Sequence, residues 1–286
     1  MDSLILKARK HYHSRLLEDG ILTVDSLGIP SNADKSSRLS VDIARGIAEQ
    51  LEAGTRAKIL GQTSGAKFES INMLFLEETF PHLQILRPGK WHIEKLGNKN
   101  SVKTSSFVQY EHLDYLNQLT RANAKLAASL GNDYMVAPDI VVFREPEPDE
   151  VINEFSDIVD DLTGCYADIR HKNNCLPILH ASVSAKWTIR SDRAQNSRTE
   201  ALGLIRNRKG RVPHIVVVTA EPLPSRLASL ALGTGDIDCV YHFALPELVK
   251  AVSSLPNEED AAEMLTILIE GKRLRDISDL PLDLAI

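Results

Sequence analysis

The clearest pattern of apolar and polar positions runs from Ala181 to Arg190, where the two kinds alternate at every residue. Alanine, valine, tryptophan and isoleucine fall on one face, whereas serine, lysine, threonine and arginine fall on the other. A period of two is typical of a β-strand with one buried face. The pattern therefore predicts a half-buried strand that ends in the charged sequence Arg190-Ser191-Asp192-Arg193.

Further patterns divide the chain into a helix-rich N-terminal half and an α/β half from about residue 135. Helices are predicted at Ser3–Glu18, Ser40–Ala53, Ser64–Phe80, Tyr110–Leu130, Asp149–Asp161, Asp192–Arg208, Ser225–Leu232, Leu245–Ser253 and Glu258–Glu270. Strands are predicted at Gln84–Arg87, Trp91–Lys95, Asp139–Phe143, Pro177–Arg190, His214–Thr219 and Ile237–Phe243. After Lys186 strands and helices alternate, which predicts right-handed crossovers and parallel pairing. We expect one domain, residues 1–286, with an α/β fold in which helices flank a mixed central sheet.

Composition is ordinary for a soluble globular protein, with 43% hydrophobic and 25% charged residues among 286. No apolar run approaches the roughly 18–20 residues of a membrane span. The N-terminal segment resembles the start of an amphipathic helix, not a signal peptide. The three cysteines are odd in number and lack metal-ligand spacing. We therefore expect a cytoplasmic protein with no membrane partner.

Charge is distributed unevenly along the chain. The net charge of −6 disfavours nucleic acid, because phosphate contacts need lysine and arginine. However, eight basic residues lie between Lys186 and Arg211, against only Asp192 and Glu200. Such a local basic region is consistent with a DNA-binding cleft in an acidic protein. A solvated surface is an equally good interpretation of the charge pattern alone.

Three separated residues suggest the chemistry. Hydrolysis of a phosphodiester needs carboxylates that hold divalent ions, a positioned water and a positive charge for the transition state. Asp139 begins one predicted strand, Lys186 lies on the polar face of another, and Glu200 follows about two helical turns into the next helix. Each residue alone is more typical of an exposed surface. Together they favour metal-dependent cleavage of DNA.

The charged sequence after the strand suggests how bases are recognised. Arginine donates two hydrogen bonds to guanine, and aspartate accepts one from cytosine. Arg190 and Arg193 around Asp192 suit G·C pairs in the major groove. The alternative is that Ser191 or Asp192 only caps the following helix while the arginines pair with surface acids.

The spacing of these residues resembles a known active-site motif. Pro138-Asp139, 46 intervening residues, Lys186, 13 more residues and Glu200 are similar to the variant motif of the PD-(D/E)xK restriction endonucleases that cut CCGG-cored sites. The common form of that fold has an acid two residues before the lysine, where this chain has Ser184. The resemblance covers about Gln62–Glu69 and Pro138–Arg193, extended to Glu200.

The resemblance implies a restriction endonuclease-like fold, Mg²⁺ as cofactor and a defined set of site residues. The catalytic residues would be Asp139, Lys186, Glu200, Glu69 and Ser184. The metal ligands would be Asp139, Glu200, Glu69 and the backbone carbonyl of Ala185. The bases would be contacted by Arg190, Asp192 and Arg193, and the outer base pair by Asp34, Gln62 and Arg226.

The resemblance also implies an activity and partners. We expect a type II restriction enzyme that cuts double-stranded DNA at a palindromic CCGG-cored site, GCCGGC, leaving 5′ phosphates and 5′ overhangs. A homotetramer built from dimers, a cognate DNA methyltransferase and a bacterial cytoplasm are expected with it. Two alternatives stay open: a structure-specific PD-(D/E)xK repair nuclease, and a DNA-binding or assembly protein without catalysis.

Overall fold

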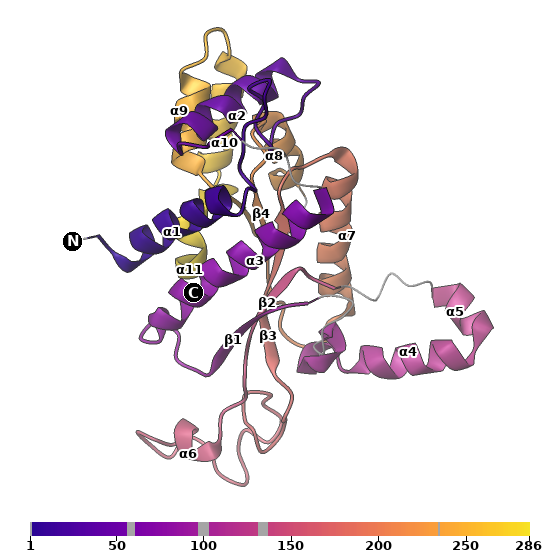
Figure 1. The fold of residues 1–286 in the computed structure, drawn as a ribbon. Coiled ribbons are helices and arrows are strands. Elements are labelled where there is room, and N and C mark those ends of the chain that lie inside the picture. The colour runs from indigo at the N-terminus through magenta and orange to yellow at the C-terminus, as the bar shows by residue number, and fades with distance from the viewer. Residues whose placement is uncertain (1, 56–60, 97–102, 131–136, 234) are drawn as a thin grey trace.

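The central feature of the computed structural model is a six-stranded sheet (Figure 1). The structure describes residues 2–55, 61–96, 103–130, 137–233 and 235–286, without the side chains of residues 61, 62, 127, 130 and 191–194. The strands, in spatial and chain order, are β1 (Trp91–Lys95), β2 (Ile140–Arg144), β3 (Ile178–Lys186), β4 (His214–Thr219), β5 (Cys239–His242) and β6 (Leu274–Asp276). β1, β2 and β3 pair antiparallel, and β3 to β6 pair parallel. The predicted mixed sheet with parallel pairing after Lys186 is confirmed.

Helices lie on both sides of this sheet. Figure 1 shows α3 crossing the sheet and α7 running beside it. Their bounds are α1 (Leu4–Glu18), α2 (Arg38–Gln50), α3 (Gly61–Thr79), α4 (His112–Ala122), α5 (Ala124–Leu130), α6 (Asp149–Ile152), α7 (Ser191–Asn207), α8 (Pro224–Ala231), α9 (Leu245–Ser253), α10 (Glu259–Glu270) and α11 (Leu280–Asp283). The short 3₁₀ helices in the described part of the chain are η1 (Phe80–Leu83), η2 (Thr104–Ser106), η3 (Val108–Tyr110) and η4 (Ile277–Asp279). None of the described helices is long and apolar enough to cross a membrane.

Strand β3 is buried on both faces, so the prediction of a half-buried strand was wrong. Ser182 and Ser184, on the polar face, are only 5% and 7% exposed. Trp187 continues the apolar face and packs edge-on against Phe68 of α3, with ring centroids 5.1 Å apart. The strand also ends at Lys186, four residues earlier than predicted. Part of this polar face has partners inside the protein: the hydroxyl of Ser184 and Nζ of Lys186 both contact the carboxylate of Asp139.

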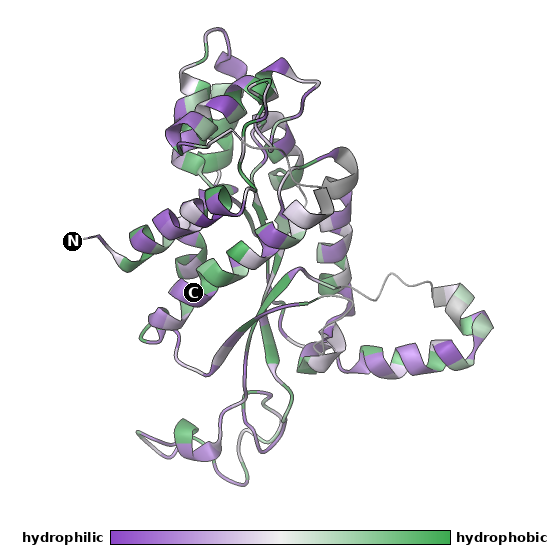
Figure 2. Cartoon of the chain, viewed as in Figure 1, coloured by the Kyte–Doolittle hydropathy of each residue, from purple (hydrophilic) through white to green (hydrophobic). Residues whose placement is uncertain are grey.

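Hydropathy follows the layers of the fold. Figure 2 shows hydrophobic residues concentrated along the central strands and the inner sides of the helices. Val141, Val142, Val183 and Val218 are fully buried. Such complete burial is expected in a sheet that is covered on both faces. The core therefore fixes the strand ends that carry the site.

Several predicted elements were wrong or incomplete. Gln84–Arg87 is a turn, since the N–H groups of Leu86 and Arg87 both donate to the carbonyl of Leu83 at 2.9 Å. The helix predicted at Tyr110–Leu130 is interrupted at Asn123, whose side chain accepts from the N–H groups of Lys125 and Leu126. The short strand β6 was not predicted.

The helix predicted at Asp149–Asp161 is restricted to α6, which ends at Ile152. Directly after it, Oδ1 of Asn153 accepts from the N–H groups of Ile158 and Val159, both at 2.9 Å. These side-chain bonds compete with helical hydrogen bonds. The region from residue 145 to 177 therefore forms an irregular extension that projects from the sheet (Figure 1).

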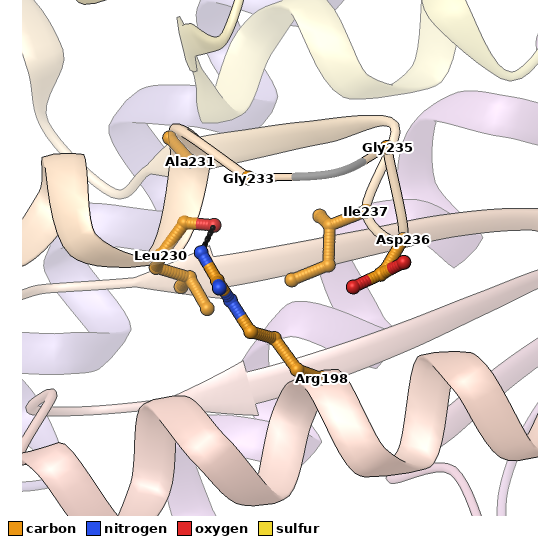
Figure 3. A pocket seen from close by; sticks show the side chains of 7 residues that line it. All are labelled: Arg198, Leu230, Ala231, Gly233, Gly235, Asp236 and Ile237. Atoms are coloured by element: carbon orange, nitrogen blue, oxygen red, sulfur yellow. Dashed lines mark hydrogen bonds between the residues drawn. The ribbon is translucent and has the colours of Figure 1, made fainter.

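One arginine of the basic region has a structural role. Arg198 of α7 donates to the carbonyl oxygen of Ser229 at 2.7 Å. It also donates to the carbonyl oxygen of Leu230 at 3.4 Å and points into the small pocket beside the end of α8, as Figure 3 shows. A Cβ at Gly233 would lie 2.8 Å from the Arg198 guanidinium, so glycine permits this approach. A cation at a helix C-terminus stabilises the last carbonyl groups. Arg198 thus joins α7 to α8.

Candidate active site

Asp139 and Lys186 meet where β2 and β3 part. Ladder pairing of the two strands stops at Ile140 opposite Val183. Beyond that point, Oδ2 of Asp139 accepts from the backbone N–H of Ala185 and from Nζ of Lys186, both at 2.8 Å. The side chains of Asp139 and Lys186 are 18% and 19% exposed. The Asp139 carboxylate therefore takes the place of a strand partner and holds Lys186 at the carboxyl end of β3.

The carbonyl of Ala185 faces the same side of β3 as its N–H. In an antiparallel ladder, the N–H and C=O of one residue point toward the same neighbouring strand. Since the N–H of Ala185 donates to Asp139, strand geometry places its carbonyl on the same side of β3.

Glu200 reaches this group from α7. Burial raises the pKa of Glu200; Lys186 opposes this effect, the charge of Asp139 adds to it, and a hydrogen bond with Ser184 opposes it. Burial alone would lower the pKa of Lys186, but the charges of Asp139 and Glu200 raise it overall. Asp139, Lys186, Glu200 and Ser184 thus form one electrostatically coupled cluster.

Ser184 links the two carboxylates. Its hydroxyl lies 3.4 Å from Oδ2 of Asp139 and hydrogen-bonds to Glu200. A serine at this position leaves room for an acid from the neighbouring helix, whereas a carboxylate there would add a third negative charge beside Asp139 and Glu200. The local geometry is therefore suited to an acid displaced onto α7.

Glu69 lies close to the cluster but has a different direct partner. Its Oε2 lies 3.0 Å from Nζ of Lys95 on β1. That ammonium also donates to the carbonyl of Ala66 at 3.0 Å and to the hydroxyl of Ser70 at 3.2 Å. Glu69 contributes only a weaker charge interaction to Lys186.

The donor groups suit a hard divalent cation by their chemistry. Among the described residues, no three histidine, cysteine, aspartate or glutamate side chains form a group that could hold a metal. The partly buried carboxylates of Asp139 and Glu200 are nevertheless close enough that the charge of Asp139 raises the pKa of Glu200. Mg²⁺ binds oxygen ligands and often only one or two carboxylates, and its charge would relieve this repulsion. Asp139 and Glu200 therefore fit such an ion.

The charged segment after β3 opens helix α7. Arg190 is exposed and occupies the N-cap position with no side-chain capping bond. Neither Ser191 nor Asp192 is the N-cap residue, since the helix already begins at Ser191. The side chains of Asp192 and Arg193 lie outside the described residues. An exposed arginine at a helix N-terminus, four residues after Lys186 in the chain, is accessible to a nucleic acid.

The predicted outer-base-pair residues lie on two separate segments. Arg226 of α8 forms an ion pair with Asp34, which precedes α2. The hydroxyl and N–H of Ser36 and the guanidinium of Arg226 hold the pKa of Asp34 below its usual range. The side chain of Gln62 lies outside the described residues.

A buried acid that was not predicted lies between these segments. Glu221 is fully buried, and its carboxylate accepts from the N–H groups of Ile189 at 2.8 Å and Leu223 at 3.2 Å. Burial raises the pKa of Glu221 to about 7. The available signal was an acid directly after the apolar strand His214–Thr219, in the sequence Ala220-Glu221-Pro222.

Comparison with known proteins decides the family. The model of the family described as NgoMIV restriction enzyme matches residues 12–286. The chain is 51% identical over 287 residues to the type II restriction enzyme NgoMIV of Neisseria gonorrhoeae, and the match covers all of both chains. The chain belongs to the NgoMIV restriction enzyme family.

Membership of the NgoMIV family confirms the resemblance to restriction endonucleases. Two solved structures of restriction endonucleases are also similar to the chain. The complex of Bse634I with cognate DNA has 16% identity, covers 90% of this chain and 92% of the other, and has a TM-score of 0.37. The complex of PspGI with substrate DNA has 12% identity, covers 98% and 91%, and has a TM-score of 0.27.

Proposed function

We propose that this chain is a Mg²⁺-dependent type II endonuclease of the PD-(D/E)xK class that cuts double-stranded DNA at a palindromic, CCGG-cored site. GCCGGC is the proposed site, with 5′ phosphates and 5′ overhangs as the proposed ends. The observation that carries the proposal is the cluster of Asp139, Lys186 and Glu200, with the exposed Arg190 between Lys186 and Glu200 in the chain. Identity of 51% with a type II restriction enzyme over the whole chain supports it.

Four groups are proposed to hold Mg²⁺: Asp139, Glu200, the carbonyl of Ala185 and Glu69. When bound, the ion would supply Lewis-acid chemistry for hydrolysis of the scissile phosphate. The observed ion pair of Glu69 with Lys95 means that Glu69 must exchange partners, or act through an intervening water, to take part.

Lys186 provides the positive charge beside the scissile phosphate. Its contact with Asp139 fixes the ammonium at the carboxyl end of β3. There it orients the attacking water and stabilises the negative charge that develops on the phosphoryl oxygens. Ser184 orients Glu200 through the hydrogen bond between them. Chemistry of this kind depends mainly on position and preorganised charge.

Base recognition is assigned to two sets of residues. Arg190, Asp192 and Arg193 are proposed to contact the inner CCGG pairs, because bidentate arginine–guanine contacts and aspartate–cytosine contacts discriminate these bases. Asp34, Gln62 and Arg226 are proposed to contact the outer pair. The ion pair of Arg226 with Asp34 supports their joint action.

The enzyme is proposed to act as a homotetramer built from dimers. A palindromic site matches two-fold symmetry in the protein. The extension from residue 145 to 177 exposes large apolar side chains, with Phe155 at 92%, Leu162 at 87% and Tyr166 at 97%. Exposed apolar groups of this size favour burial against a second copy. A methyltransferase of the same specificity would protect the DNA of the bacterial host.

Digestion of matched plasmids tests the proposed function. One plasmid carries a single GCCGGC site, a second carries the same site with its outer pair changed, and a third has the inner CCGG changed. We expect Mg²⁺-dependent cutting of the first plasmid only. Cutting confined to junctions or nicks would favour a repair nuclease. A gel shift without cutting across a range of Mg²⁺ and Mn²⁺ would favour a non-catalytic DNA-binding protein.

A further inference from the structure

Glu221 occupies the carboxyl end of β4, beside the end of β3. Lys186 is opposite Thr219 in the parallel ladder, so the segments that follow the two strands leave the sheet together. In open α/β sheets, ligands bind outside the carboxyl ends of the strands. Glu221 is 0% exposed and therefore lies beneath this surface rather than on it.

Its two oxygens bind two different segments. Oε2 accepts from the N–H of Ile189, the residue directly before Arg190, at 2.8 Å. Oε1 accepts from the N–H of Leu223, the N-cap residue of α8, at 3.2 Å. Arg226 lies in the first turn of that helix. One carboxylate thus fixes the segments before both Arg190 and Arg226.

The segment that carries Asn32 and Asp34 also contacts the region around Glu221. Nη1 of Arg226 lies 3.8 Å from Oε1 of Glu221, and Nη2 of Arg226 pairs with Asp34. The side-chain amide of Asn32 donates to the carbonyl of Ala220 at 2.9 Å. Glu221 is therefore at the junction of the segments that carry Arg190, Arg226 and Asp34.

We propose that Glu221 is a positioning residue for sequence recognition, which sets the spacing between the inner contacts from Arg190 and the outer contacts from Arg226 and Asp34. This proposal rests on the proposed function. A buried carboxylate has a desolvation cost that an apolar residue of similar size would not have. Glu221 offsets this cost through hydrogen bonds from two backbone N–H groups and through its interaction with the guanidinium of Arg226.

The test uses Glu221→Gln in the full chain, compared with wild type on the three plasmids described above. Glutamine has nearly the same shape, but it has one acceptor oxygen and an NH₂ group that cannot accept from a backbone N–H. We expect the ratio of kcat/KM for GCCGGC to kcat/KM for the outer-pair variant to fall at least about tenfold, the scale of one lost base contact. The maximal rate on GCCGGC should fall less than this ratio.

A matched control separates positioning from general stability. Asp276 is 6% exposed and accepts from the N–H groups of Leu245 and Ser278, both at 3.0 Å, two strands away from β4. Asp276→Asn should lower the melting temperature but keep the discrimination ratio of wild type. An unchanged ratio in Glu221→Gln, or an equal loss in Asp276→Asn, would overturn the proposal.

A second substitution at Glu221 and a double mutation with Arg226 test the same role independently. If Glu221→Gln does not fold, Glu221→Asp is measured instead; its shorter side chain should also lower the ratio, and wild-type discrimination in it would contradict the role. Double mutation with Arg226→Ala should lower the ratio by less than the product of the single effects, and full additivity would count against the coupling. Absence of specific cutting by wild type would instead refute the proposed function.

Discussion

Nζ of Lys186 lies 2.8 Å from Oδ2 of Asp139, although the two residues are 47 positions apart in the chain. The antiparallel pairing of β2 with β3 brings them together, and the end of that pairing frees the N–H of Ala185 to bind the same carboxylate oxygen. The ion pair is therefore a direct consequence of strand register. Three testable consequences concern the cluster and the adjacent segment, and a fourth concerns Glu221.

Replacing Lys186 with alanine should remove cleavage while leaving DNA binding largely intact. In the proposed mechanism the ammonium stabilises charge that develops only in the transition state, so its loss should lower kcat by roughly 10²–10³-fold or more. Plasmid cleavage and gel shifts on the same DNA measure the two effects. Near wild-type cleavage by Lys186→Ala would show that this lysine has no catalytic role.

Removal of metal should reveal the repulsion between Asp139 and Glu200. In EDTA at alkaline pH, Glu200→Gln should melt at a higher temperature than wild type, because burial and the charge of Asp139 raise the pKa of Glu200 and make its ionised form costly. Mg²⁺ at about 100 times its Kd should stabilise wild type by about 2.7 kcal/mol. The same concentration of Mg²⁺ should stabilise Glu200→Gln by much less.

Glu263→Gln is the matched control for that experiment, since Glu263 is an exposed acid on α10. It should respond to Mg²⁺ as wild type does. An equal Mg²⁺ response in Glu200→Gln would mean that Glu200 is not a ligand.

Replacing Arg190 with alanine should relax recognition of the inner bases. Loss of a bidentate contact costs about 1–3 kcal/mol of discrimination. The ratio of cleavage at CCGG-cored sites to cleavage at sites with an altered core should therefore fall roughly 10- to 100-fold. Arg206→Ala, an exposed arginine near the other end of α7, should change overall affinity and its salt dependence without changing this ratio. The same ratio in both variants would argue against base contact by Arg190.

The stability of wild type and Glu221→Gln should diverge with pH. Burial raises the pKa of Glu221 to about 7 from 4.5, with Asp34 adding to the effect and the bonds from Ile189 and Leu223 and the charge of Arg226 opposing it. The folded state therefore binds more protons than the unfolded state between these values, and stability falls as pH rises through this window.

Glutamine has no such titration. The free energy of unfolding of Glu221→Gln relative to wild type should therefore increase between pH 5 and pH 8, by up to about 3 kcal/mol. Urea unfolding at both pH values measures it. A difference that is constant over this range would mean that Glu221 titrates outside it.

The sequence predicted the sheet and the proximity of Asp139, Lys186 and Glu200 for identifiable reasons. Strands β2 and β4 contain continuous apolar runs, β3 alternates apolar with polar residues, and the alternation of strands and helices after Lys186 dictates parallel pairing. The spacing of Asp139, Lys186 and Glu200 matched a motif whose members the structure brings together. Local pattern and global fold agree in this part of the chain.

Other features could not be predicted because they depend on tertiary contacts. The polar face of β3 is buried, although its alternation is the same as that of an exposed face. The side chain of Asn153 ends α6 early through two local hydrogen bonds. Lys95 and Glu221 bind groups that are distant in sequence, 26 positions away at Glu69 and 32 positions away at Ile189. Only the folded arrangement reveals such partners.

The most direct test of the proposed endonuclease activity is end sequencing of long, unmethylated DNA after incubation with the wild-type protein and Mg²⁺, with Lys186→Ala in parallel. We expect wild-type ends to map to GCCGGC, to carry 5′ phosphates and 5′ overhangs, and to be absent from the variant and from an EDTA control. Ends at unrelated sequences, or the same ends from Lys186→Ala, would refute the proposed function.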